Sequence, residues 1–393
     1  MGNSIKPKYS KPLPQPTAIY PNVQRRVAFW CIGVFAIFLR LLTLPRRCFK
    51  KRQNTYLVYE PYGMGDVIAL QPFVMALAKS GGRVIVAVKE EWQAIFPKHD
   101  NIKLVSANVS YSKYRNKKAG LLKSFLDTAR ALREEASGAI GFDIRGDVRS
   151  ICLMYLAGCT KVESFNRYFT ANDCRVPFGC VSHRYSIDRA ALRFELNKQL
   201  LPKTAEEKFT PPDLSHLIDP ATEEALEQGT IALVPLAGWS GKEWIPESWA
   251  SVIASLKDKG HNLAVVFGPK EREQAIAAIG GAEAAANVQL KEATTVKVWV
   301  NILNSASYVI SVNTGPMHIA AALKKPQIVI EGTSRIPLWA PANSNAIVIH
   351  YQNGKEIRAI HQIDSNAEYS RRVMSKISAD EVFSVMEKLL KKE

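Results

Sequence analysis

The chain has 393 residues, of which 47% are hydrophobic, and it carries a formal net charge of +16. That length and apolar content allow two hydrophobic cores, so we expect two domains with additional segments. Residues 1–55 hold 11 of the 52 lysines and arginines but none of the 36 acidic residues, which leaves a surplus of only 5 basic residues elsewhere. Most of the excess positive charge therefore belongs to an amino-terminal arm and not to the globular part.

The six cysteines form no Cys-x-x-Cys pair and have no metal-ligand spacing with histidine, a pattern that suits a reducing compartment. We predict buried or free thiols, although Cys174 and Cys180 are close enough in sequence to pair. No familiar nucleic-acid-binding module is present, and we expect no nucleic-acid partner, although charge alone does not exclude one.

The amino-terminal arm combines a polar tail with an apolar run. Residues 1–26 are rich in Pro, Lys and Gln without aliphatic periodicity, which predicts disorder. Residues 27–54 begin with the apolar run Val27–Leu44, interrupted only by Arg40, and end in a basic flank. A helix of these 18 apolar-run residues would reach about 27 Å, just short of a ~30 Å hydrocarbon core. This N-terminal hydrophobic helix predicts a membrane anchor, spanning or only inserted, that binds anionic lipid; a buried helix of a soluble domain is the alternative.

Beyond residue 54, short apolar strands alternate with helical stretches, which predicts parallel sheets of the α/β class. We expect an N-terminal Rossmann-like domain at 55–202, a linker at 203–229 and a C-terminal Rossmann-like domain at 230–393. Two such domains place their strand ends across a cleft, where ligands of this architecture bind. The expected strands are 55–61, 83–88, 102–107, 139–144 and 161–165, then 231–236, 263–268, 308–312 and 327–332, with later helices at 247–259, 271–279, 296–304 and 379–391.

The most informative stretch is 308–332, which reads as a strand, a polar turn, an apolar helix and a second strand. The turn, residues 313–316 (NTGP), lies at the carboxyl end of a strand and opens the helix. Free backbone N–H groups at a helix start, a glycine that allows close approach and the helix dipole favour a bound phosphate. Because the proline of the turn has no N–H, Thr314, Gly315 and Met317 must supply the donors. The turn predicts a site for the pyrophosphate of a nucleotide, although many such turns bind nothing.

A second candidate site follows the first strand of the N-terminal domain, where the residues GMGD (63–66) enter a helix. The two glycines permit a tight turn, and Asp66 would then be aimed into the cleft. A carboxylate at a strand end that faces a nucleotide site is where a general base would lie, while a simple N-cap is the alternative. The motif lacks the third glycine of a dinucleotide fingerprint, so it gives little support for NAD.

Two further strand ends of the C-terminal domain carry polar groups suited to a nucleotide. In the loop 235–246, Ser240 and Lys242 suit a phosphate clamp, with charge-assisted bonds worth roughly 1.5–3 kcal/mol each. Glu271 follows another strand, in FGPKE (267–271), where a carboxylate could hold ribose hydroxyls. A solvated loop lysine and a helix-start glutamate are the alternatives.

The basic, aromatic stretch 111–123 is the last candidate. It contains no acidic residue and suits an acidic acceptor such as a phosphorylated or carboxylated glycolipid, although a charged loop is often only solvated. Its basic residues include Lys113, Arg115, Lys117 and Lys118.

In this order, the motifs resemble glycosyltransferase family 9, the ADP-heptose:lipopolysaccharide heptosyltransferases. The resemblance implies the GT-B fold, with two Rossmann-like domains facing a cleft, and an inverting sugar transfer that needs no bound metal and no cofactor. The chain fittingly has no Asp-x-Asp motif. The matching pieces, within roughly residues 55–345, are GMGDVIALQPFVMAL, FDIRGD, GKEWIPESWASVI, FGPKERE and VNTGPMHIAAALKKPQIVIEGT.

The resemblance also implies roles for single residues. Asp66 would be the general base, Lys242 would contact the pyrophosphate and Glu271 the ribose, while the backbone of 314–317 would hold the phosphates. We place the donor site at Ser240, Lys242, Glu271, Asn313, Thr314, Gly315, Met317 and His318. We place the acceptor site at Gly65, Lys113, Arg115, Lys117, Lys118 and Arg145.

One position departs from the family pattern, which usually has Asp where this chain has Asn313. Asn keeps an acceptor oxygen but loses a negative charge beside the pyrophosphate, so the donor stays open. We expect transfer of a heptose or related sugar from a nucleotide sugar, above all ADP-heptose, to a lipopolysaccharide-core or similar glycolipid. The enzyme would work at the inner (cytoplasmic) membrane surface with its catalytic domains on the cytoplasmic side. The alternatives are a same-fold transferase with another donor or acceptor, and a non-catalytic membrane-bound binder of nucleotide sugar or glycolipid.

Overall fold

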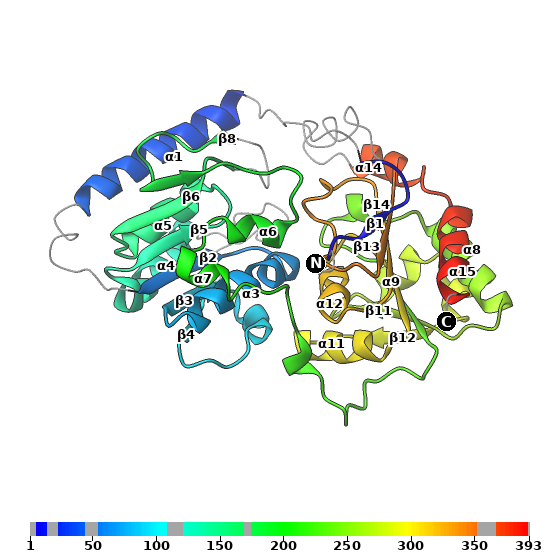
Figure 1. Ribbon diagram of the computed structural model, residues 1–393. Helices are drawn as coiled ribbons and strands as arrows, with labels where there is room; N and C mark the ends of the chain where they lie inside the picture. Colours follow the sequence, from blue (N-terminus) through cyan, green and yellow to red (C-terminus); the bar gives the residue numbers. More distant parts are fainter. Residues whose placement is uncertain are drawn as a thin grey trace. The chain divides into compact units, whose positions relative to one another are not determined.

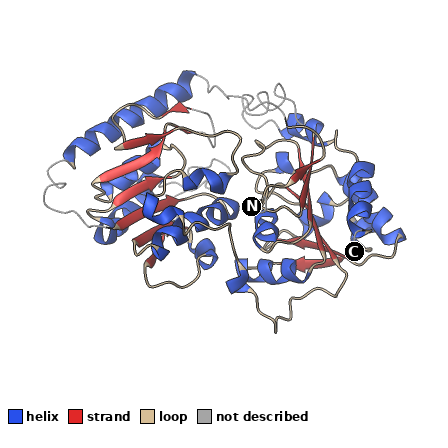
Figure 2. Cartoon of the chain, viewed as in Figure 1, coloured by secondary structure: helices blue, strands red, loops and turns tan. Residues whose placement is uncertain are grey.

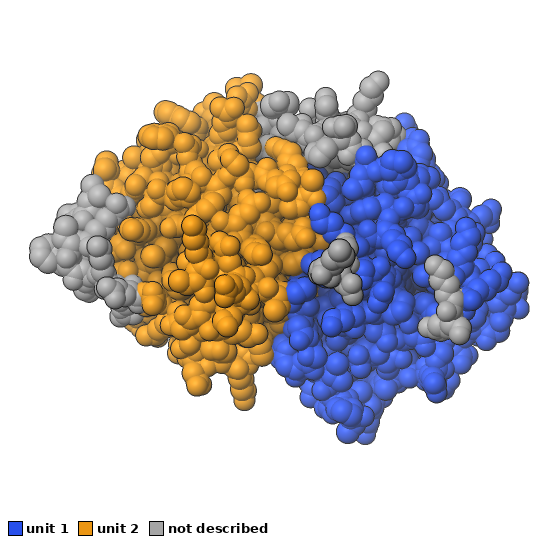
Figure 3. Space-filling model, in the orientation of Figure 1, with its two compact units in different colours: residues 1–17, 211–393 blue, residues 18–210 orange. Residues whose placement is uncertain are grey.

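The computed structural model describes residues 5–13, 23–43, 54–107, 121–168, 174–351 and 367–391. The chain divides into two compact units: unit 1 contains residues 1–17 and 211–393, and unit 2 contains residues 18–210 (Figure 3). The division after Thr210 falls inside the linker expected at 203–229, which contains the short helices α7 (Lys203–Glu206) and η2 (Ser215–Leu217). Each unit has a sheet of its own with helices packed on it (Figures 1 and 2).

Unit 2 is built on a six-stranded sheet in the order β4-β3-β2-β5-β6-β9, and every neighbouring pair is parallel. Because side chains alternate along a strand, Leu57 and Tyr59 of β2 join the core that the sheet shares with α1, α4 and α5. The strands are β2 (Thr55–Glu60), β3 (Arg83–Val88), β4 (Ile102–Ser106), β5 (Ile140–Asp143), β6 (Lys161–Phe165) and β9 (His183–Tyr185), with an antiparallel pair β7 (Arg167–Tyr168) and β8 (Cys174–Arg175) beside them. The helices are α1 (Val23–Leu42), α3 (Met64–Lys79), η1 (Glu90–Ile95), α4 (Leu121–Ala136), α5 (Val148–Leu156) and α6 (Arg193–Lys198).

Unit 1 contains a seven-stranded, wholly parallel sheet in the order β1-β15-β14-β13-β10-β11-β12. Its core packs the two buried tryptophans Trp244 and Trp249 against the sheet and the C-terminal helix. The strands are β1 (Lys8–Tyr9), β10 (Ile231–Val234), β11 (Leu263–Phe267), β12 (Gln289–Glu292), β13 (Tyr308–Val312), β14 (Gln327–Glu331) and β15 (Ala346–His350). The helices are η3 (Ser240–Lys242), α8 (Pro246–Asp258), α9 (Arg272–Ala278), α10 (Ala282–Ala285), α11 (Val296–Ser305), α12 (Gly315–Ala322), α14 (Ala367–Met374) and α15 (Ala379–Leu390).

The predicted α/β class with parallel sheets is confirmed, and each of the nine expected strands is present. The structure adds β12 and β15 near the sheet edges, and the short strands β1, β7, β8 and β9. One difference concerns the polar tail expected to be disordered, because Lys8 and Tyr9 form β1 in parallel with β15. Backbone hydrogen bonds to a sheet edge do not need the apolar periodicity on which that expectation rested. Lys11 also forms an ion pair with Glu381 of α15, at 3.2 Å.

The apolar run of the arm forms α1, which begins at Val23 and ends at Leu42. One side of the helix packs on α5, burying Phe29, Gly33 and Ala36. In Figure 1, α1 lies along the outside of the sheet of unit 2. Within the residues that the structure describes, no helix combines the length and the hydrophobicity that crossing a membrane requires.

Candidate active site

Asp66 lies in the first turn of α3, directly after the carboxyl end of β2. The turn between them is tight, and the Oδ2 atom of Asp66 accepts a hydrogen bond from the backbone N–H of Gly63 at 3.2 Å. The N-cap residue is Gly63 rather than Asp66, so the N-cap alternative is wrong as stated, but Asp66 at position N3 satisfies the N-cap N–H as in a capping box. This bond occupies only the Oδ2 atom, so capping does not account for the position of the second carboxylate oxygen, Oδ1.

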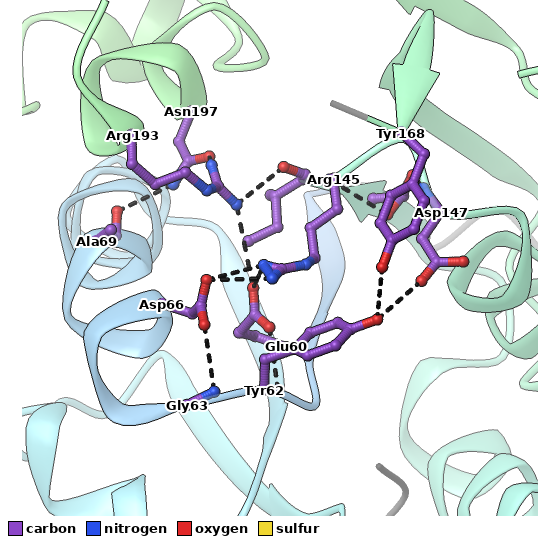
Figure 4. Close-up of polar contacts among 12 residues, drawn as sticks. Glu60, Tyr62, Gly63, Asp66, Ala69, Arg145, Asp147, Tyr168, Arg193 and Asn197 are labelled. Atoms are coloured by element: carbon purple, nitrogen blue, oxygen red, sulfur yellow. Dashed lines mark hydrogen bonds and ion pairs between the residues drawn. The ribbon is translucent and has the colours of Figure 1, made fainter. Parts of the chain in front are cut away.

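The second oxygen of Asp66 is held by Arg145, which follows β5, the strand beside β2 in the sheet. The Oδ1 atom of Asp66 accepts hydrogen bonds from both terminal nitrogens of Arg145, at 2.8 and 3.1 Å. The Cζ atom of the same guanidinium group lies over the ring of Tyr62, 3.9 Å from its centroid. The contacts with Gly63 and Arg145 fix the orientation of Asp66 (Figure 4). The Asp66 side chain is nevertheless 16% exposed. The prediction placed Arg145 at the acceptor, and the structure brings it against the predicted base.

Arg145 is itself buried and compensates a second carboxylate, Glu60, the last residue of β2. Its Nη1 atom lies 3.5 Å from Glu60 Oε2, and the Nη2 atom of Arg193 lies 4.0 Å from the same oxygen. We call these four residues, Glu60, Asp66, Arg145 and Arg193, the Arg145 cluster. When Glu60 is ionised, two arginines and two carboxylates balance in charge, which is what a buried ionic group requires.

The loop that carries Arg145 is fixed by Asp143 and by a glycine. The buried Asp143 accepts hydrogen bonds from the backbone N–H groups of Arg145 and Asp147, at 3.3 and 2.9 Å, and one from the Ser164 hydroxyl. Gly146 has φ +73°, and a Cβ there would lie 1.9 Å from a backbone oxygen, so only glycine fits. These constraints explain why the motif RGD (145–147) directs its arginine toward α3.

Neither Glu60 nor Arg193 was singled out from the sequence, although both belong to the cluster. Arg193 lies on α6, where it donates hydrogen bonds to the backbone oxygen of Ile144 at 3.0 Å and to the Oδ1 atom of Asn197. Asn197 in turn donates to the backbone oxygen of Ala69 in α3, at 2.9 Å. The helix that carries the predicted base is therefore tied to the cluster from two directions.

Burial dominates the titration of Glu60 and raises its pKa from 4.5 to about 7, against the opposing attraction of Arg145. Since the folded state then holds this proton more tightly than the unfolded chain, the contribution of Glu60 to stability is present below pH 4.5 and is lost as the pH rises through 7. We expect the wild-type protein to lose roughly 1–3 kcal/mol of unfolding free energy relative to Glu60→Gln between pH 5 and pH 8, because one pKa unit corresponds to about 1.4 kcal/mol.

Urea unfolding of both proteins at the two pH values measures this difference, and Asp143, whose pKa burial also raises to about 7, titrates equally in both. A stability difference between wild type and Glu60→Gln that does not change with pH would show that Glu60 is ionised throughout.

In unit 1, the predicted donor residues come together at one edge of the sheet. β13, β10 and β11 are neighbours, and their carboxyl ends lead into Asn313, the loop with Ser240 and Lys242, and Glu271. Because parallel strands end at the same edge, three loops far apart in the sequence share one location. The Nζ atom of Lys242 lies 3.4 Å from Asn313 Oδ1, which joins two of these loops directly.

Asn313 also uses the other end of its amide, donating from Nδ2 to the backbone oxygen of Trp339 at 3.0 Å. Trp339 was not among the predicted residues, because nothing in its local sequence shows that its carbonyl faces the end of β13. Glu271 precedes α9, and its Oε2 atom accepts the backbone N–H of Gly268 at 2.9 Å. A helix-start role is therefore present for Glu271, as for Asp66.

The turn after β13 opens α12 as predicted, with Thr314 at the N-cap and Gly315 and Pro316 in the first turn. No side chain caps this helix start, so its backbone donors depend on other partners. Thr314, Gly315 and His318 are partly exposed, whereas the Met317 side chain is buried, which leaves only its backbone for the predicted role. Gly65, the remaining acceptor candidate of unit 2, is partly exposed in α3. Lys113, Arg115, Lys117 and Lys118 lie outside the described residues.

Known proteins resemble the chain in sequence and in fold. Over 162 residues it is 28% identical to lipopolysaccharide heptosyltransferase 3 of Escherichia coli K12, covering 41% of this chain and 46% of that protein. Over 107 residues it is 31% identical to lipopolysaccharide heptosyltransferase 1 of the same strain, covering 27% of this chain and 33% of that one. The chain thus matches less than half of the length of these relatives.

Solved structures extend the likeness of fold over most of the chain. The E. coli heptosyltransferase WaaC with ADP superposes with a TM-score of 0.63 at 19% identity, over 85% of this chain and 99% of that one. A family 9 glycosyltransferase from Veillonella parvula gives a TM-score of 0.65 at 18% identity, over 86% and 98%. The family model of glycosyltransferase family 9 (heptosyltransferase) matches residues 129–368. Because this match covers more than half of the chain, the protein belongs to glycosyltransferase family 9.

Proposed function

We propose that the protein transfers a heptose, with inversion, from ADP-heptose to a sugar hydroxyl of a lipopolysaccharide-core or similar glycolipid. Family membership supports the reaction class, and the double hydrogen bond from Arg145 to Asp66 is the observation that carries the mechanism. A general base needs a carboxylate that is ionised, fixed in direction and accessible to substrate. Asp66 has an arginine partner, a fixed orientation and a partly exposed side chain.

The reaction is a single in-line displacement. Asp66 accepts the proton of the acceptor hydroxyl, whose oxygen attacks the anomeric carbon of the donor. The bond between that carbon and the diphosphate oxygen breaks with its electron pair, so ADP leaves and the configuration at the anomeric carbon inverts. The proposal includes the GT-B arrangement, in which the acceptor and the donor are bound by different Rossmann-like domains.

Charge that develops on the leaving diphosphate is stabilised by Lys242 and by the backbone N–H groups at the start of α12. The proposal therefore assigns this role to fixed protein groups rather than to a metal ion. Ser240 adds a hydroxyl donor from the same loop as Lys242, and Glu271 accepts hydrogen bonds from the ribose hydroxyls. All of these groups follow the adjacent strands β13, β10 and β11, which supports a single donor site.

The acceptor is lipid-linked in this proposal, so the reaction takes place at the cytoplasmic face of the inner membrane, where soluble nucleotide sugar and lipid meet. The basic stretch 111–123 would bind acidic groups of the acceptor, since it carries five lysines and arginines and no carboxylate.

Mass spectrometry of the acceptor tests the proposal. The protein is incubated with a lipid A–inner-core acceptor and, in turn, with ADP-heptose and with other nucleotide sugars. We expect the acceptor to gain the mass of one heptose residue with ADP-heptose alone. A gain in acceptor mass with a different nucleotide sugar would keep the fold and the mechanism but replace the donor. No gain in acceptor mass with any nucleotide sugar would contradict the transferase.

Asn313 gives a separate prediction for donor binding. Asn313→Asp would place a carboxylate 3.4 Å from the Lys242 ammonium and beside the diphosphate, and it would remove the donor to the Trp339 oxygen. We expect the KM for ADP-heptose to change by less than about threefold, because the added carboxylate pairs with the Lys242 ammonium and the family pattern has Asp at this position. Initial rates at varied donor concentration measure it, with the exposed Asn287→Asp as matched control. A rise in KM of tenfold or more would show that the added charge repels the diphosphate and that this chain requires Asn for ADP-heptose.

A further inference from the structure

The outer side of α1 carries a continuous stripe of large apolar side chains. The stripe residues are each 41–61% exposed, and their spacing of three or four positions places them on one side of the helix. Single exposed apolar residues are ordinary on protein surfaces, but a row along one helix marks an interaction surface. We call these residues the α1 stripe: Val27, Trp30, Val34, Phe38 and Leu41.

The inner side of α1 is fixed to unit 2, so the helix cannot turn its stripe inward. Phe29, Gly33, Ala36 and Leu39 are buried there. A Cβ on Gly33 would lie 2.4 Å from Pro177, which shows how closely the helix approaches the loop beneath it. Removal of the stripe from water therefore requires a partner outside this unit.

Arg40 is the only charged residue within the apolar run, and it points toward the protein. Its Nη1 atom donates hydrogen bonds to the backbone oxygens of Gly179 and Val181, at 2.7 Å each. The charge is thus removed from the stripe. Phe178, which directly precedes Gly179, is 83% exposed, and the Arg184 guanidinium lies over its ring at 4.9 Å from the centroid.

The charges around α1 indicate what kind of partner covers the stripe. All eleven charged side chains of residues 1–55 are basic: Arg25 and Arg26 lie in the first turn of the helix, and Arg46, Arg47 and Lys50 follow it in the sequence. A second copy of the chain would bring two such basic arms together, which like-charge repulsion opposes. An anionic lipid surface attracts each basic residue by about 1 kcal/mol and accepts apolar side chains just below it.

We propose that α1 is an in-plane docking helix that inserts its stripe into an anionic bilayer while its inner side remains on unit 2. An amphipathic helix lies in the plane of a membrane when its apolar side is buried in lipid and its opposite side is solvated by water. Here the protein itself covers that opposite side, which explains why a helix with no polar face can lie along a membrane. This inference goes beyond sugar transfer and does not depend on it.

Vesicle sedimentation tests the docking. The full-length protein is mixed with vesicles of phosphatidylcholine, alone or with phosphatidylglycerol. We expect binding to the anionic vesicles, at least tenfold weaker binding to the neutral ones, and at least tenfold weaker binding of the triple variant Trp30→Ser, Phe38→Ser, Leu41→Ser. Leu126→Ser on α4 removes an exposed leucine of the same unit that lies outside the basic stretch 111–123, and it should bind like wild type. Equal binding of the triple variant and wild type would overturn the proposal, as would loss of binding in the Leu126 variant.

A fluorophore reports the depth of the helix independently of any loss of binding. Cys31 is exposed on α1, and Cys152, Cys159, Cys174 and Cys180 are buried, so a Cys48→Ser protein is labelled at Cys31 with an environment-sensitive dye. We expect a blue shift on adding anionic vesicles. No shift in the presence of bound vesicles would place the membrane contact elsewhere.

Light scattering tests whether a second copy of the chain, rather than lipid, covers the stripe. A concentration-dependent dimer that the triple variant abolishes would assign the stripe to a second copy and overturn the proposal.

Discussion

Replacement of Asp66 by Asn is expected to lower kcat for heptose transfer by about 10²–10⁴-fold, because a positioned general base typically contributes that much. Asn keeps an oxygen that can accept from Arg145 and a similar volume, so the Arg145 cluster should stay folded. The effect should fall on kcat rather than on the KM for either substrate. Single-turnover formation of the lengthened acceptor, measured by mass spectrometry at saturating donor, isolates the chemical step.

Asp127→Asn is the matched control for Asp66→Asn, since Asp127 also accepts from an arginine, Arg130, but lies exposed on α4. It should transfer heptose at the wild-type rate. A rate for Asp66→Asn within about threefold of wild type would remove Asp66 as the base and leave it with the helix-capping role alone.

Replacement of Arg145 by Met is expected to lower the unfolding free energy of unit 2 by about 3–5 kcal/mol, the usual cost of breaking a buried ion pair. Arg145 is 5% exposed and faces both Glu60 and Asp66. Its removal leaves the buried Glu60 with the more distant Arg193, at 4.0 Å, and the Tyr62 backbone N–H, at 3.1 Å. Urea unfolding at pH 8 measures the loss. The rate of heptose transfer should also fall, because Asp66 loses the two hydrogen bonds from the Arg145 guanidinium that fix its orientation.

The pH dependence of this variant supplies a check on the cause. Arg145 opposes the rise in the pKa of Glu60, so without it Glu60 takes up a proton more readily. A neutral Glu60 does not need a cationic partner, and the destabilisation by Arg145→Met should be smaller at pH 5 than at pH 8. Arg130→Met, in an exposed pair with Asp127, should change stability by less than about 1 kcal/mol at either pH. An equally small effect for Arg145→Met would show that the cluster is not held by charge.

The sequence allowed the parallel sheets to be predicted because their central strands are short, β-branched and buried, as in β13 and β14. The edge strands were missed for the opposite reason. β12 has a partly exposed, charged sequence, and β1 consists of two residues whose pairing depends on β15, over 330 residues away in the sequence. Local patterns carry no information about such distant partners.

The candidate site was predictable to the extent that its residues follow strands directly. Asp66, Lys242, Glu271 and Asn313 all lie just after a predicted strand, and parallel strands bring their ends to one edge. Glu60 could have been predicted, because a carboxylate at the end of a buried apolar strand requires a cation nearby. Arg193 could not, since it reaches Glu60 from a helix more than 130 positions later.

The apolar run of the arm shows a different limit. Hydrophobicity on every side of a helix predicts lipid or a protein interior around it, and α1 has protein on one side only. The loop 176–181, which contacts the inner side of α1, lies more than 130 residues away in the sequence. Sequence alone therefore cannot distinguish a helix with one side on protein from a helix surrounded by lipid.

Release of ADP from ADP-heptose, with and without the lipid A–inner-core acceptor, tests the central claim most directly. The account predicts that wild-type protein releases ADP only when the acceptor is present, and that Asp66→Asn lowers this release by about 10²–10⁴-fold, in parallel with heptose transfer. ADP release that is independent of the acceptor would indicate a hydrolase, and binding of ADP-heptose without any release would indicate a non-catalytic binder. Either result would contradict a transferase that uses Asp66 as its base.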